Sequence, residues 1–287
     1  MGTGATKVWL QGRIHGNEPY GTDTLLDVLK TLGSSGSPTA RAIRAACTVH
    51  VIPMYNPDGT ELYIRHTVLQ DGTERRIDLN RDWALNAFVA KESKAWYTYW
   101  TQVKPDWGLD IHHQGLKYDT ETDEPITMSL GISLAPSGPT LPDIRGGEFD
   151  RTTRRMQGYV YEQLSRYGYV NIDRYSVGGP GQYREIDIKG GVASAVMLGL
   201  NWNNLNPSGH SHPMVFFETY GGSIGQKSRG KAIQQNVRGA TELLHGMATG
   251  AVAATDPMIW HRIPHVPYVG YFTDTGATTG WPTRPPV

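Results

Sequence analysis

The sequence predicts an α/β fold built on a mainly parallel sheet. Two observations predict it. Short apolar runs rich in β-branched residues alternate along the chain with longer segments that have helical spacing, which is the pattern of parallel strands covered by helices. The chain has 287 residues, of which 38% are hydrophobic and 19% charged, and this is enough for one sizeable core. We therefore predict one main domain over residues 1–250 and an irregular C-terminal extension over residues 251–287.

The first two elements set the order of strand and helix. The apolar run Val8-Trp9-Leu10 lies in an expected strand over residues 6–11. Residues 21–32 then have helical spacing, and Gly33 is suited to the end of that helix. The apolar side chains expected on one side of the helix are Leu25, Leu26, Val28 and Leu29. A strand that leads into a helix is typical of parallel α/β folds.

The same order repeats as far as residue 111. A short helix is expected over residues 38–47, and the β-branched run 48–54 predicts a strand that stops at the turn Asn56-Pro57-Asp58-Gly59. A helix rich in Trp and Tyr is expected over residues 91–103, and a strand follows over residues 107–111.

The second half of the chain is less regular. Residues 118–150 are rich in Gly, Pro, Ser, Thr and acidic residues, which predicts a long surface excursion over a site. The elements expected after it are a charged amphipathic helix over residues 151–166, strands over 169–172 and 193–199, an apolar run over 214–217 and a closing helix over about 223–247. After residue 256 the composition predicts an irregular tail.

Composition and charge exclude several classes of partner. Basic and acidic residues are equal in number, 27 each, and the basic ones are scattered, so neither a nucleic acid nor an acidic membrane surface is expected as a partner. The longest uncharged apolar run, residues 192–200, is far too short to span a bilayer. A single cysteine, Cys47, rules out an internal disulfide framework. A small or local substrate is the partner that these observations favour.

The first ten residues show no recognisable targeting signal. Residues 1–10 lack the basic and apolar regions of a signal peptide. Because the first expected strand starts almost at residue 6, the sequence is also compatible with a chain that begins partway into its domain.

Two short motifs carry possible metal ligands. His15-Gly16-Asn17-Glu18 places an imidazole and a carboxylate three residues apart in a loop after the first strand. Asp110-Ile111-His112-His113 ends another strand, where side chains alternate; Ile111 prefers the packed side, so His112 is the expected third ligand. Two imidazoles and one carboxylate form a catalytic zinc site whose fourth position is open to water. A surface ion pair and a hydrogen-bonded His doublet are the alternatives for each motif alone.

Five motifs occur in one order along the chain. They are His15-Gly16-Asn17-Glu18, Asn56-Pro57-Asp58-Gly59, Asp78-Leu79-Asn80-Arg81, Asp110-Ile111-His112 and Phe217-Glu218. Together they span residues 6–247, and the set resembles the zinc carboxypeptidases of the carboxypeptidase A type. This resemblance implies a three-layer α/β/α sandwich with a mixed, mainly parallel twisted sheet. It also implies a zinc site at the carboxyl ends of the strands, where open α/β sheets bind ligands.

The resemblance assigns roles to the metal site. It implies that His15, Glu18 and His112 hold one zinc ion per chain, a ligand set of which carboxypeptidase A is itself a known example. Asp78 matches the carboxylate that accepts a hydrogen bond from the first imidazole. Glu218 matches the general base, which takes a proton from water and later delivers it to the leaving amine. A glutamate that caps nearby glycine amides is the alternative for Glu218.

Two further roles follow from the resemblance. Asn80 and Arg81 match the pair that grips the terminal carboxylate of the substrate, for which a planar guanidinium is apt. A structural ion pair between Asp78 and Arg81 is the alternative. Arg65 is the candidate for the cation beside the oxyanion, although Arg75 and Arg76 occupy the same interval of the family pattern.

The function implied is that of a metallocarboxypeptidase, a zinc hydrolase acting on a peptide or amino-acid-derived substrate with a free carboxylate. A deacylase of N-acyl amino acids, similar to aspartoacylase, is the first alternative because it shares the His-Gly-Asn-Glu and Asp-Leu-Asn-Arg motifs. A non-catalytic binding module on the same fold is the second. The resemblance also favours a secreted or periplasmic protein.

Three features depart from the family pattern or lie outside it. Residues 190–200 contain no counterpart of the mobile tyrosine of digestive members. His210 and His212 suggest a second metal site, although a polar loop with exposed imidazoles is the favoured interpretation. Loops 118–150 and 200–213 are expected to shape the pocket.

Overall fold

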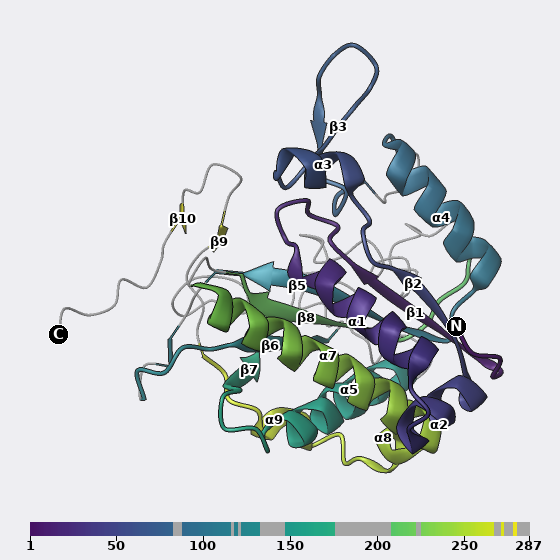
Figure 1. Ribbon diagram of the computed structural model, residues 1–287, viewed down its shortest axis with the longest axis vertical. Helices are drawn as coiled ribbons and strands as arrows, with labels where there is room; N and C mark the ends of the chain where they lie inside the picture. The colour runs from purple at the N-terminus through teal and green to yellow at the C-terminus, as the bar shows by residue number, and fades with distance from the viewer. Residues whose placement is uncertain are drawn as a thin grey trace.

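A computed structural model describes residues 1–82, 88–115, 118–119, 122–132, 147–175, 208–221, 225–266, 271–272 and 278–279. Its centre is a six-stranded sheet in the order β2-β1-β5-β8-β6-β7, with helices on both faces (Figure 1). All neighbouring strands of this sheet pair in parallel except β6 and β8, which are antiparallel. The predicted α/β fold with a mixed, mainly parallel sheet is confirmed.

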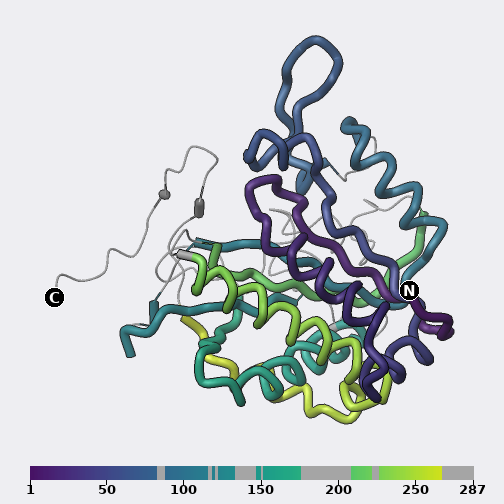
Figure 2. Tube along the Cα trace, viewed as in Figure 1, coloured from purple at the N-terminus to yellow at the C-terminus, as the bar shows by residue number. Residues whose placement is uncertain are grey.

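The strands of the main sheet are β1 (Thr6–Gly12), β2 (Cys47–Ile52), β5 (Trp107–Gln114), β6 (Met128–Ile132), β7 (Ile172–Arg174) and β8 (Met214–Tyr220). Two small ribbons pair β3 (Thr67–Val68) with β4 (Arg76–Ile77), and β9 (Tyr271–Phe272) with β10 (Thr278–Thr279). The β3–β4 hairpin projects from the body of the molecule (Figure 2).

The helices are α1 (Tyr20–Ser34), α2 (Pro38–Ala46), α3 (Pro57–Leu62), α4 (Lys91–Val103), α5 (Glu148–Leu164), α7 (Gly225–Thr249), α8 (Ala251–Ala254) and α9 (Ile259–Arg262). Local chemistry explains where some of them start. The hydroxyl of Ser37 accepts a hydrogen bond from the amide of Ala40, and Pro38 occupies the first turn of α2.

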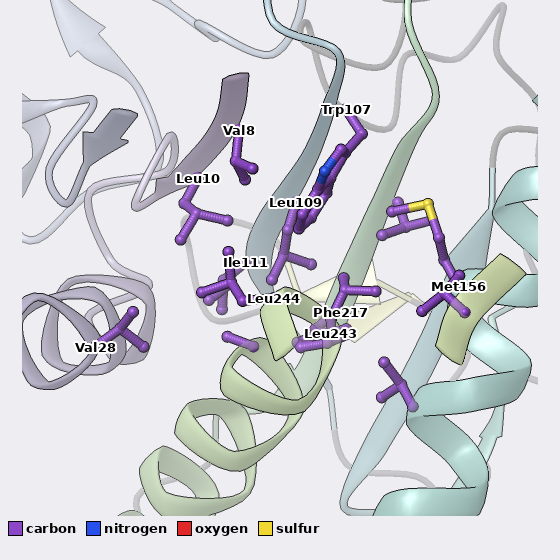
Figure 3. Close-up of a cluster of buried hydrophobic side chains, with 14 of the residues drawn as sticks. Val8, Leu10, Val28, Trp107, Leu109, Ile111, Met156, Phe217, Leu243 and Leu244 are labelled. Atoms are coloured by element: carbon purple, nitrogen blue, oxygen red, sulfur yellow. The ribbon is translucent and has the colours of Figure 1, made fainter. Parts of the chain in front are cut away.

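The main hydrophobic core lies between one face of the sheet and helices α1, α5 and α7 (Figure 3). Strand residues that point to this face alternate along each strand, for example Val8 and Leu10 in β1 and Leu109 and Ile111 in β5. The opposite face is met by α4, where the rings of Trp9 and Trp96 pack edge to face at a centroid distance of 5.7 Å.

The expectation of a surface excursion over residues 118–150 is wrong for β6, which is a buried strand between β8 and β7. The sequence of β6 did not predict a buried strand because its apolar residues alternate with Ser129 and Gly131 and form no continuous apolar run. The glycine is required here: a Cβ atom on Gly131 would lie 1.9 Å from the ring of Phe216. Residues 133–146 lie outside the described residues, and α5 begins at Glu148, before the predicted start at residue 151.

The predicted apolar side of helix α1 is wrong at one position, Leu26. Leu25 and Val28 are buried, but Leu26 is 51% exposed. One residue advances an α-helix by 100°, so Leu26 falls outside the stripe formed by residues 25, 28, 29 and 32. The helix also continues past Gly33 to Ser34.

Two other segments are more regular than expected. Asn56-Pro57-Asp58-Gly59 is not a simple turn but the start of α3, with the side chain of Asn56 as its cap. Residues 251–266 were expected to be irregular, yet they form α8 and α9, and Val252 and Trp260 are buried in the core. The predicted strand over 193–199 lies outside the described residues.

Candidate metal centre

The loop between β1 and α1 carries the first two candidate ligands, and α3 fixes its shape. Gly16 approaches α3 so closely that a Cβ atom on it would lie 2.0 Å from the carbonyl carbon of Gly59. The side-chain nitrogen of Asn56 donates to the backbone carbonyl oxygens of Ile14 and Arg65, both at 3.2 Å. The Asn-Pro-Asp-Gly motif therefore ties the His-Gly-Asn-Glu loop to the segment that follows α3.

His15, Glu18 and His112 meet at the carboxyl ends of β1 and β5. Each offers one ligand atom, and these atoms all lie within 4.8 Å of one another. The Nδ1 atom of His15 lies 2.7 Å from one oxygen of Glu18, and the Nδ1 atom of His112 lies 3.3 Å from the other. All three side chains are buried. The structure thus brings together three residues that are up to 97 positions apart in the sequence.

Each imidazole of the cluster also has a carboxylate on its far side. The Nε2 atom of His15 lies 3.5 Å from Asp78, and the Nε2 atom of His112 lies 3.0 Å from Asp110. An ionised carboxylate only accepts hydrogen bonds, so a neutral imidazole whose proton is on Nε2 directs that proton to Asp78 or Asp110 and has its lone pair on Nδ1. Both Nδ1 lone pairs then face Glu18, which is also an acceptor. A cation between these three groups satisfies all of them, so the residues fit a zinc ion.

The electrostatics of the cluster agree with this donor set. Burial alone would raise the pKa of Glu18, but the imidazoles of His15 and His112 outweigh it and the pKa lies well below its ordinary value. Burial alone would lower the pKa of His112, but Asp110 and Glu18 outweigh it and the pKa lies well above its ordinary value. Opposite charges at these distances favour the charged forms of both partners.

Glu218 lies beside the cluster on the next strand. In the pairing of β5 with β8, its Cα atom is the partner of that of His112. Burial raises the pKa of Glu218 to about 8, and the carboxylate of Glu18 adds to the shift, while His112 and Arg65 oppose it. A divalent cation on the cluster would favour the ionised form of Glu218 at neutral pH. The carboxyl group of Glu218 therefore lies beside the candidate ligands His112 and Glu18.

Asp78 and Arg65 form a second layer behind His15. The Nε atom of Arg65 donates to Asp78 at 3.0 Å, and its Nη1 atom lies 3.4 Å from Nδ1 of His15. Burial would raise the pKa of Asp78, but the hydrogen bond from His15 and the charges of Arg65 and Arg81 hold it well below its usual range. Arg75 and Arg76 are exposed, and Arg76 lies in the projecting hairpin. Of the three arginines considered, Arg65 is the one that lies beside the cluster.

Asn80 and Arg81 follow Asp78 directly. Asn80 is buried, and its backbone amide donates to the carboxylate of Asp78 at 2.8 Å. Arg81 is exposed and donates to the carbonyl oxygen of Asn80 at 3.0 Å. Its guanidinium is close enough to Asp78 to lower the pKa of that carboxyl group. The alternative of a direct Asp78–Arg81 ion pair is less favoured because Arg65 occupies that role.

Two residues near His112, Asp110 and Gln11, were not predicted as part of the site. Asp110 lies on the same side of β5 as His112, and the Asp-x-His spacing of a strand was the available signal for it. Gln11, which donates to Asp110 at 2.8 Å, gave no signal at all. The backbone amide of His113 also donates to Glu18 at 3.1 Å.

The structure corrects the expectation that the imidazole of His212 is exposed in a polar loop. His212 is not exposed but buried, and its Nε2 atom accepts a hydrogen bond from the indole of Trp100 at 3.1 Å. Its Nδ1 atom donates to the carbonyl oxygen of Pro213 at 2.9 Å. Both ring nitrogens are thus used, and burial lowers the pKa of His212 to about 3. His212 precedes β8, at the opposite end of the strands from the cluster, and is a neutral structural histidine.

Comparisons with known proteins agree with the predicted resemblance. The sequence model of the zinc carboxypeptidase family matches residues 2–113, a segment that contains His15, Glu18 and His112 but not Glu218. A curated relative, Probable carboxypeptidase 2 of Arthroderma benhamiae, is 30% identical over 106 residues, which are 37% of this chain and 18% of that protein. The aligned segment thus spans less than a fifth of that relative.

Solved structures extend the likeness of the fold to most of the chain. A metallo-carboxypeptidase from Burkholderia cenocepacia superposes with a TM-score of 0.57 and 18% identity, over 87% of this chain and 60% of that one. Carboxypeptidase A from Helicoverpa armigera gives a TM-score of 0.54 and 15% identity, over 87% and 62%. The predicted resemblance to the zinc carboxypeptidases is confirmed. In the described part of the chain, no helix is both long and apolar enough to cross a membrane.

Proposed function

We propose that this chain is a zinc-dependent metallocarboxypeptidase, which hydrolyses the C-terminal amide bond of peptides. The observation that carries the proposal is the convergence of the Nδ1 atoms of His15 and His112 on the carboxylate of Glu18, with a carboxylate behind each imidazole. Glu218 on the adjacent strand supplies a fourth acid at the same place. Together these groups provide ligands and a base for the hydrolysis of an amide.

Proton transfer is the task of Glu218. When bound, zinc supplies a Lewis acid that polarises the scissile carbonyl and lowers the pKa of water to about 7. The carboxylate of Glu218 accepts a proton from the attacking water and donates it to the leaving amine nitrogen. Asp110 accepts the Nε2 proton of His112 at 3.0 Å, and Asp78 faces Nε2 of His15 at 3.5 Å, so Nδ1 of each ring is the nitrogen available as a ligand.

The substrate is held by cations and an amide near Asp78. Asn80 and Arg81 bind the terminal carboxylate of the peptide, and Arg65 faces the oxyanion that forms at the scissile carbonyl. The fixed position of Arg65 against Asp78 supports this assignment, since a donor held in place stabilises developing charge without reorganisation. Loss of one such donor typically costs about 3 kcal/mol of transition-state stabilisation.

The test is a digestion of peptides with free and with amidated C-termini, with and without a chelator. We expect release of C-terminal residues from the free acids alone, and loss of this release after chelation or in Glu218→Gln. Equal cleavage of amidated peptides would contradict the role of Asn80 and Arg81. Hydrolysis of N-acyl amino acids without any cleavage of peptides would replace the proposal by the deacylase alternative.

A further inference from the structure

A buried hydrogen-bonded chain leads from two tryptophans to the candidate ligand His112. The side-chain oxygen of Gln11 accepts hydrogen bonds from the indoles of Trp9 at 3.0 Å and Trp96 at 2.8 Å. The side-chain nitrogen of Gln11 donates to Asp110 at 2.8 Å, and the same oxygen of Asp110 lies 3.0 Å from Nε2 of His112. Gln11 and Asp110 are completely buried and are paired in register on β1 and β5.

The donors and acceptors in this hydrogen-bonded series allow only one orientation of the Gln11 amide. An indole nitrogen only donates, so the atom of Gln11 that faces two indoles is its oxygen, and its NH₂ group faces Asp110. Asp110 is therefore an acceptor on that side. The same oxygen can accept from His112 only if the proton of the imidazole is on Nε2. The two indoles thus place, through Gln11 and Asp110, a proton on Nε2 of His112, so that Nδ1 is the ring nitrogen whose lone pair can bind a metal.

The direction of that lone pair matters because Nδ1 is the atom of His112 that faces Glu18. We propose that Gln11 and Asp110 are positioning residues for His112, which hold its ring orientation and its tautomer so that Nδ1 is presented to the metal. This inference rests on the proposed zinc site. It goes beyond it by assigning Gln11 and the indoles of Trp9 and Trp96 to the support of one ligand.

The two imidazoles of the cluster differ in this respect. His15 is backed by Asp78, which is partly exposed and shared with Arg65 at the edge of the site. His112 is backed by a carboxylate with no solvent exposure, whose other partner is the amide of Gln11. Partners of this kind typically change metal affinity about 10- to 100-fold when they are replaced. Gln11 is the residue whose change isolates the effect.

Gln11→Glu is the test variant, because it keeps the shape of the side chain and the oxygen that accepts from both indoles but replaces the NH₂ donor to Asp110 with a second carboxyl oxygen. We expect zinc affinity of the full chain, measured by competition with a chromophoric chelator, to fall about tenfold or more. The absorption spectrum of the cobalt-substituted protein is expected to change in the same variant. Asp110→Asn, which also keeps its shape, is expected to act in the same direction and serves where Gln11→Glu does not fold.

Gln157→Glu is the matched control. Gln157 is equally buried, but its amide donates to the backbone carbonyl oxygens of Gly131 and Phe216 on the helix-covered face of the sheet. We expect this variant to lose stability while it keeps the zinc affinity and cobalt spectrum of the parent. Zinc affinity at the parental value in both Gln11→Glu and Asp110→Asn would overturn the positioning role and leave the proposed function intact. A parent chain that binds no zinc would overturn both.

Discussion

The two faces of the central sheet differ in chemistry although the same strands build both. One face presents Leu109, Ile111 and Phe217 to helices α1, α5 and α7, and these side chains form the main core. The other presents Asp110 and His112 from β5 and Glu218 from β8. Because side chains alternate along a strand, neighbouring residues belong to opposite faces. Residues that form the core and residues of the candidate site therefore occupy adjacent positions in the same strand, and each kind can be substituted separately.

The sharpest test of this difference uses the neighbours Phe217 and Glu218. Phe217 is completely buried against the helices, so Phe217→Ala is expected to lower the free energy of unfolding by about 3–5 kcal/mol. Glu218→Gln keeps its shape and removes a buried charge, so the free energy of unfolding is expected to stay within about 1 kcal/mol. The same change is expected to lower kcat about 100- to 10,000-fold.

Denaturant unfolding and peptide hydrolysis measure the two effects on the same preparations. The comparison of the faces fails if Glu218→Gln unfolds as easily as Phe217→Ala. It also fails if Phe217→Ala, assayed under conditions where it stays folded, loses activity as completely as Glu218→Gln does.

How far the sequence predicts each face depends on the range of the interactions. His15 and Glu18 are three residues apart, and the alternation of β5 selects His112, so local spacing was enough to predict the three candidate ligands that the structure brings together. The contact between Gln11 and Asp110 joins residues 99 positions apart and follows from the pairing of β1 with β5, which no local pattern contains. Local patterns therefore predicted the candidate ligands but not the residues that contact them from neighbouring strands.

The helix-covered face shows the same limit. Strands β1, β2 and β5 were predicted to within three residues of their observed bounds, because each follows or precedes a helix of clear periodicity, whereas the two-residue strands β3 and β4 were not predicted. Strand β6 was missed because it is only five residues long and is held by pairing with β8, some eighty residues later. Choosing Arg65 over Arg75 and Arg76 likewise needed the hairpin that carries Arg76 away from the cluster.

A second prediction contrasts two buried histidines, of which His112 lies between carboxylates and His212 has neutral partners. Burial lowers the pKa of His212 to about 3 from an ordinary value of 6.5. The folded chain therefore resists a proton that the unfolded chain accepts, and stability present above pH 6.5 is lost as the pH falls from 6.5 towards 3.

The measurement compares the free energy of unfolding of the parent with that of His212→Gln at pH 7, 6, 5 and 4. Over this range we expect the free energy of unfolding of the parent to fall by up to about 1 kcal/mol per pH unit more than that of the variant. The acidic groups titrate in both proteins, so their contribution cancels in the comparison. Parallel profiles would show that His212 accepts a proton as readily in the folded chain as in the unfolded chain, contrary to its two neutral hydrogen bonds.

A third prediction concerns the side chains of α1 that pack against the helix-covered face of the sheet. Leu25 is buried in the main core, whereas Leu26 is 51% exposed. Leu26→Ala is expected to change the free energy of unfolding by no more than about 0.5 kcal/mol, since it removes little buried area and alanine favours helix. Leu25→Ala is expected to cost about 2–5 kcal/mol. Thermal unfolding of both variants measures the difference. A loss above about 2 kcal/mol in Leu26→Ala would mean that another surface covers this side of α1, so that the apolar stripe is wider than the sheet face it packs against.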